Sequence, residues 1–71
     1  MDHERQIQLL VQAERHVAEG VQHIADQERR IADLRREGRD VTKACSLLEL
    51  FQDTQAKHIA HRNLLLKELE R

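Results

Sequence analysis

The 71-residue chain contains no proline, tryptophan or tyrosine, and it has one phenylalanine, two glycines and one cysteine. Few of its residues can therefore end a helix. The lone Cys45 cannot form an intramolecular disulfide, which favours a reducing compartment. No apolar run is long enough to cross a membrane, and the acidic start lacks the basic region of a secretory signal. We therefore expect a soluble, cytoplasmic protein that does not bind membranes.

Catalytic and cofactor-binding motifs are also missing. The sequence has no glycine-rich loop for phosphate and no recognisable pairing of a nucleophile with a base. A chain of this length forms one small domain, residues 1–71, whose core is too small for much stability without a partner. We expect a protein that is not an enzyme, that needs no cofactor, and that gains stability by association.

A seven-residue repeat occupies the middle of the first half of the chain. Residues 15–21, 22–28 and 29–35 read RHVAEGV, QHIADQE and RRIADLR, with a β-branched apolar residue at the third position and alanine at the fourth. A seven-residue apolar period keeps one side of an α-helix facing a partner helix. The pattern predicts a coiled coil.

The strongest break in the pattern is EGRD at residues 37–40. Gly38 suits the left-handed position that ends a helix, and Asp40 suits the N-cap of the next one. The sequence thus predicts an all-α fold: a two-helix antiparallel coiled-coil hairpin with a helix over residues 2–37, a turn at 38–40 and a helix over 41–70.

The apolar spacing predicts which residues lie between the two helices. A turn at 38–40 also implies that residues whose numbers sum to about 78 face each other, so Ala44 should meet Leu34. Gly20 should then either make room for His58 or be a tolerated exposed glycine. In the first helix the predicted seam is Leu10, Val17, Ile24 and Ile31, joined by Ile7, Val21 and Leu34, with the small residues Ala13, Ala18, Gly20, Ala25 and Ala32 beside it. In the second helix it is Val41, Ala44, Leu48, Phe51, Gln55, His58, Arg62, Leu65 and Leu69.

Several apolar residues remain outside this seam, and a hairpin has no place to bury them. Unburied apolar surface of this kind usually marks an interface. The simplest partner is a second copy, which would give a homodimeric four-helix bundle, although a different protein could also cover these residues. The predicted interface consists of Leu9, Val11, Leu47, Leu50, Leu64 and Leu66, with Phe51 as an aromatic anchor.

Five histidines raise the question of a metal site. His58 and His61 are three residues apart on one helix, and the antiparallel arrangement brings His16 and Glu19 towards them. No HExxH motif or second cysteine supports such a site, so we expect no metal and keep His16, His58 and His61 as weak candidates. If His58 is enclosed near Arg62, its protonation between about pH 5 and 7 would weaken the packing.

Positive charge is concentrated around the turn. Residues 29–43 carry six basic and three acidic residues, whereas residues 1–28 carry two basic and six acidic ones. Such a patch could bind nucleic acid, but it lacks aromatic residues for stacking and is interrupted by Asp33, Glu37 and Asp40. The interruptions favour ordinary surface ion pairs over nucleic-acid binding. The basic residues are Arg29, Arg30, Arg35, Arg36, Arg39 and Lys43.

One resemblance covers nearly the whole chain. The repeat segment, the Gly-Arg-Asp turn and the segment LLELFQDTQAKHIAHRNLLLKEL resemble short proteobacterial proteins that combine an IAxL-type helix, a Gly-Arg/His-Asp turn and an LLxxF…HxxHRxxLLxEL helix. That set has no assigned activity. The resemblance therefore implies a bacterial helical-hairpin protein and supplies no site, and our expectation for function is a protein–protein interaction module.

Overall fold

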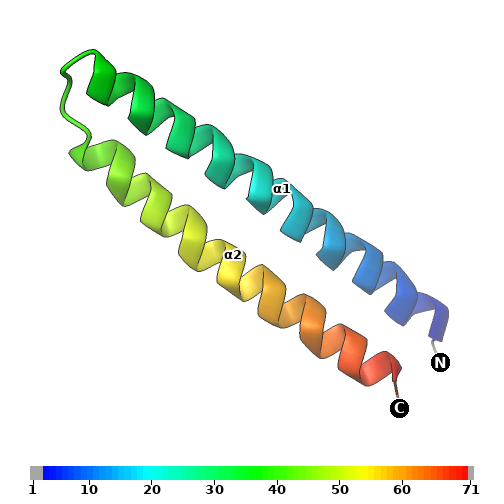
Figure 1. Ribbon diagram of the computed structural model, residues 1–71. Coiled ribbons are helices and arrows are strands. Elements are labelled where there is room, and N and C mark those ends of the chain that lie inside the picture. Colours follow the sequence, from blue (N-terminus) through cyan, green and yellow to red (C-terminus); the bar gives the residue numbers. More distant parts are fainter. Residues whose placement is uncertain (1–2, 71) are drawn as a thin grey trace.

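Two antiparallel α-helices make up residues 3–70, the part of the chain described by the structure, which is a computed structural model. Helix α1 spans His3–Arg36 and helix α2 spans Thr42–Leu69. They lie side by side in a rod of 56 × 14 × 13 Å, with the start of α1 and the end of α2 at one end of the rod and the turn at the other (Figure 1). The expected all-α hairpin is confirmed.

The helix bounds differ by one residue from the expected ones at three ends. Helix α1 ends at Arg36 instead of residue 37, α2 begins at Thr42 instead of 41, and α2 ends at Leu69 instead of 70. The expected start at Asp2 lies outside the described residues. Within residues 3–70, no helix is long and apolar enough to cross a membrane.

Gly38 ends α1 in the left-handed conformation expected of it, with φ at 71°. Its N–H donates to the carbonyl of Arg35 at 3.0 Å, and the N–H of Arg39 donates to the carbonyl of Leu34 at 2.9 Å. These two bonds form a Schellman motif, which pairs carbonyls that the helix itself leaves without a donor. Arg35 and Arg36 in the same turn add positive charge near the negative end of the helix dipole.

The start of α2 differs from the prediction that Asp40 is its N-cap. Val41 occupies that position, and its carbonyl accepts the first helical bond from Cys45 at 2.8 Å. Asp40 lies one residue earlier and accepts from the backbone N–H of Thr42 at 3.0 Å and from its hydroxyl at 2.7 Å. The physical reason is that an aspartate can bond two residues ahead in an Asx-turn before the helix begins.

Both helices contact each other through residues spaced alternately by three and four, as in a coiled coil. In α2 the buried and half-buried residues at this spacing coincide with the predicted seam. In α1 they do not, because Ile7 and Val21 are exposed to solvent, 43% and 60% respectively. The observed seam of α1 is Gln6, Leu10, Ala13, Val17, Gly20, Ile24, Gln27, Ile31 and Leu34.

The seam of α1 therefore alternates large apolar residues with small or polar ones. Ala13 is buried and Gly20 half-buried, whereas the larger Ile7 and Val21 lie one position further round the helix. Small residues allow the two backbones to approach closely, and this outweighs the burial that the larger residues would gain. Of the described residues, only Ala13, Ile31 and Leu65 are buried apolar residues.

The register of the two helices is shifted from the predicted one by about one helical turn. The backbone of Ala44 meets Gln27 instead of Leu34, and His58 meets His16 instead of Gly20. The shift arises because the last turn of α1 extends past the start of α2. The connecting residues 37–41 therefore run back along the rod before α2 begins (Figure 1).

Candidate functional site

Two buried glutamines connect the helices. Gln27 of α1 donates from Nε2 to the carbonyl of Ala44 at 2.9 Å, and Gln55 of α2 donates from Nε2 to the carbonyl of Val17 at 2.8 Å. Each glutamine is only 7% exposed. A buried polar side chain needs a hydrogen-bond partner at one position along the other helix. It therefore favours the helix register that supplies this partner over shifted registers, at some cost in stability.

The absence of a side chain at Gly20 leaves space for the amide of Gln55. A Cβ added to Gly20 would overlap the Oε1 atom of Gln55, so the side chain that occupies the space at Gly20 is that of Gln55 and not that of His58 as predicted. Oε1 is buried and has no hydrogen-bond partner among the described residues. An unpaired buried oxygen costs stability, so the Gln55 layer is held in place by shape and by one bond instead of by complete pairing.

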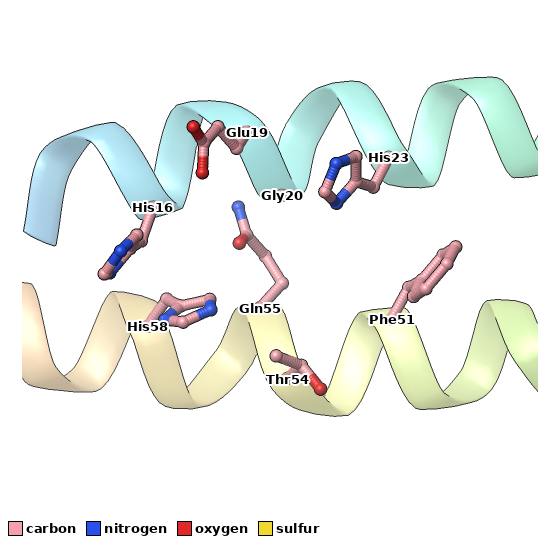
Figure 2. A pocket seen from close by; sticks show the side chains of 8 residues that line it. All are labelled: His16, Glu19, Gly20, His23, Phe51, Thr54, Gln55 and His58. Atoms are coloured by element: carbon pink, nitrogen blue, oxygen red, sulfur yellow. The ribbon is translucent and has the colours of Figure 1, made fainter.

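A small cavity of about 80 Å³ opens beside Gln55. Figure 2 shows Gln55 pointing from α2 towards Gly20 of α1, with His16 and His58 on one side and His23 and Phe51 on the other. The rings of His16 and His58 are 5.2 Å apart between centroids, and those of His23 and Phe51 are 5.9 Å apart. Each helix thus contributes aromatic rings to one side of the hairpin, where they pack in tilted pairs.

The structure brings only part of the weak metal-candidate set together. His16, Glu19 and His58 line the cavity, but His61 is exposed and does not. No group of three or more histidine, cysteine, aspartate or glutamate side chains within residues 3–70 is placed to hold a metal ion. A two-histidine pair lacks the three or four protein ligands that zinc sites use.

The hairpin presents two long faces, one on each side of the seam. A cavity on one side is lined by His23 together with Phe51 and Thr54, and a cavity on the other side by Glu28 together with Cys45. Residues at heptad-equivalent positions share a face. The histidine face consists of Arg5, Leu9, Gln12, His16, Glu19, His23, Asp26, Arg30 and Asp33 of α1 and Lys43, Leu47, Leu50, Thr54, Lys57, His61, Leu64 and Glu68 of α2, bordered by Phe51 and His58 of the seam.

The opposite side, the glutamate face, is defined in the same way. Its apolar members are smaller on average, because α1 contributes three alanines to it. It consists of Glu4, Ile7, Val11, Glu14, Ala18, Val21, Ala25, Glu28, Ala32 and Arg35 of α1 and Thr42, Cys45, Glu49, Gln52, Ala56, Ile59, Asn63, Leu66 and Glu70 of α2.

The predicted interface is divided between these faces. All of its leucines and its valine are exposed, and Phe51 is half-buried against His23. Five of the seven residues lie on or beside the histidine face, and two lie on the glutamate face. The first group is Leu9, Leu47, Leu50, Phe51 and Leu64, and the second is Val11 and Leu66.

The two faces differ in charge. Among the described residues, the histidine face carries four basic side chains (Arg5, Arg30, Lys43, Lys57) and four acidic ones (Glu19, Asp26, Asp33, Glu68). The glutamate face carries five glutamates (Glu4, Glu14, Glu28, Glu49, Glu70) and one arginine (Arg35). Sequence analysis missed this difference, although the seven-residue spacing of His16 and His23 was a usable signal for a common face.

The basic residues of the predicted patch are all exposed around the turn. Three of them pair with nearby carboxylates: Arg29 with Asp26 at 3.7 Å, Arg39 with Glu37 at 3.6 Å, and Arg36 with Asp33. Exposed pairs of this kind contribute little to stability, but they lower the positive potential that a phosphate backbone would meet.

Comparison with known proteins adds no relative. No protein family, curated protein or solved structure matches the chain. Functional inference therefore depends on the geometry and chemistry of the two faces.

Proposed function

We propose that the chain is a non-enzymatic, cytoplasmic protein–protein association module that pairs with a second copy to form a four-helix bundle. The observation that carries the proposal is the imbalance between core and surface. Three apolar residues are buried in the described part of the chain, whereas nine large apolar residues there are at least 36% exposed. The nine are Ile7, Leu9, Val11, Val21, Leu47, Leu50, Ile59, Leu64 and Leu66.

Physical considerations support association. An isolated helix needs tertiary packing to be stable in water, and a single narrow seam provides little of it. Face-to-face pairing of two hairpins would bury a second seam without changing either hairpin. A symmetric pair needs only a patch that complements itself, which is why twofold dimers are the commonest oligomers.

The test is the solution mass of the protein by light scattering on a sizing column, over a range of concentrations. We expect about twice 8.4 kDa for the wild type. The double variant Leu50→Glu, Leu64→Glu replaces two leucines that are 58% and 57% exposed, so it should lose the dimer. A folded wild-type monomer at all concentrations would contradict the proposal and would leave a different protein as the occupant of these leucines.

A further inference from the structure

We infer that the second copy docks on the histidine face and that protonation of the histidines at the centre of this face releases it. The inference builds on the proposed function: it specifies which face pairs and what regulates the pairing. Three features of the face support it: the layout of its apolar residues, its charge balance, and the position of its histidines.

The layout is nearly the same in both directions along the rod. His16 and His58 face each other near the middle. Leu9 and Leu64 lie on one side of this pair, about 10 Å along the helix from His16 and about 9 Å from His58, and Leu50 and Leu47 lie on the other side, about 12 and 16 Å from His58. If two such faces stack about a twofold axis that runs along the rod, with both turns at the same end, leucines meet leucines and histidines meet histidines.

The charge balance selects this face over the glutamate face. The histidine face carries four basic and four acidic residues, so opposite charges can pair when two such faces meet across a twofold axis. If two glutamate faces met instead, each copy would contribute five carboxylates and only one arginine to the interface. Like charges placed opposite each other in an interface oppose association, so the second copy avoids this side.

The histidines occupy the centre, where docking would remove the most water. His58 is half-buried already, and its neighbour His16 is exposed beside it. Burial disfavours the charged imidazolium, and two further histidines from the second copy would add like charge at the same place. Glu19 and His23 of α1 line the cavity together with the pair. The other ionisable groups within four residues along the two helices are Arg15 of α1 and Lys57, His61 and Arg62 of α2, together with Glu14 of α1 on the opposite face.

Proton linkage gives the direction of the effect. Glu19 is the one acidic group of that surrounding set on the histidine face, so the set as a whole does not neutralise two added imidazolium charges. The dimer therefore binds fewer protons than two separate chains, and lowering the pH favours the separate chains. A difference of one pKa unit at one histidine changes an equilibrium tenfold. We expect the dissociation constant of the dimer to rise at least about tenfold between pH 7.5 and 5.5.

The experiment is sedimentation equilibrium of the full chain at pH 7.5 and 5.5, with matched variants. His16→Gln, His58→Gln should dimerise equally well at both pH values, and His3→Gln, which changes a histidine outside the face, should keep the wild-type response. Leu50→Glu, Leu64→Glu should be monomeric at both. Val11→Glu, Val21→Glu adds the same charge at residues 54% and 60% exposed on the other face, and it should remain dimeric at pH 7.5.

Each alternative outcome has a separate meaning. A wild-type monomer at pH 7.5 would overturn the proposed function together with the inference. A wild-type dimer with the same dissociation constant at both pH values would overturn the inference alone. Loss of the dimer in Val11→Glu, Val21→Glu and its retention in Leu50→Glu, Leu64→Glu would place the interface on the glutamate face. Because the two double variants carry equal charge, a general loss of folding cannot imitate that difference.

Discussion

Gly20 lies midway along α1, where replacing glycine with alanine ordinarily stabilises a helix by about 1 kcal/mol. Here the methyl group would overlap the amide of Gln55, whose Nε2 bonds to Val17 and whose Oε1 has no partner among the described residues. The amide would have to leave its position and lose that bond. At the scale of single residues, then, the effect of a substitution at Gly20 depends on what stands at residue 55.

We expect Gly20→Ala to lower the free energy of unfolding by about 1–2 kcal/mol, because the lost hydrogen bond and the displaced buried amide outweigh the gain in helix propensity. In a Gln55→Ala background the obstacle is gone. The same substitution should then raise the free energy of unfolding by up to about 1 kcal/mol. Urea denaturation of the four proteins in the cycle measures both values.

The change of sign is the informative result. If Gly20→Ala has the same effect with and without Gln55, the glycine is a tolerated helix residue with no role in packing. Ala18→Gly provides a comparison at an exposed position of the same helix, where only helix propensity should matter.

At the scale of the helices, the start of α2 depends on Asp40. The hydroxyl and the backbone N–H of Thr42 both donate to its carboxylate, and these bonds lower its pKa from the ordinary value of 3.8. Because the pKa is lower in the folded state, the carboxylate stabilises the fold fully above pH 3.8 and loses this effect as the pH falls through the lowered pKa.

Asp40→Ala should therefore lower the melting temperature at pH 7, and the difference from the wild type should disappear in strong acid. Thermal unfolding followed by circular dichroism over pH 2–7 measures it. Asp53→Ala, an exposed aspartate within α2, serves as the control and should produce little change. A difference between Asp40→Ala and the wild type that persists unchanged at pH 2 would mean that the carboxylate is not its source.

The helices could be predicted because their signals are local. Gly38 marks the end of α1, and the three-four spacing of α2 gives its seam directly. The seam of α1 was predicted wrongly at Ile7 and Val21, because hydrophobicity alone ranks them above Ala13 and Gly20. Close helix approach favours the small residues, and this depends on the partner helix, which a single-helix pattern does not contain.

The register and the candidate site escaped prediction for a related reason. Counting residues from the centre of the turn assumes that the two helices end at the same level. The Schellman bonds and the Asx-turn at Asp40 instead start α2 about one turn lower. That shift replaces His58 by Gln55 opposite Gly20 and brings His58 to His16. A single turn of displacement thus determines which side chains lie opposite each other, such as His16 and His58.

At the scale of the whole molecule, the hairpin is a rod two helices wide, 14 and 13 Å in its smaller dimensions. Every residue is close to solvent, so no rearrangement within one chain can bury the leucines of the histidine face. Polar layers at Gln27 and Gln55 use part of the single seam for specificity instead of burial. Under the proposed pairing, most of the remaining stabilisation would come from surface that a second copy covers.

Thermal stability should consequently depend on protein concentration. When folding and pairing are coupled, a hundredfold rise in concentration favours the native dimer by about 2.7 kcal/mol. For about 140 residues unfolding together, this should raise the melting temperature by about 5–10 °C. Circular dichroism melts of the wild type at 2 and 200 μM measure the change, and Leu50→Glu, Leu64→Glu should melt at one lower temperature at both concentrations. A wild-type melting temperature independent of concentration would mean that one narrow seam is sufficient to hold the hairpin, and the exposed leucines would then have no part in its folding.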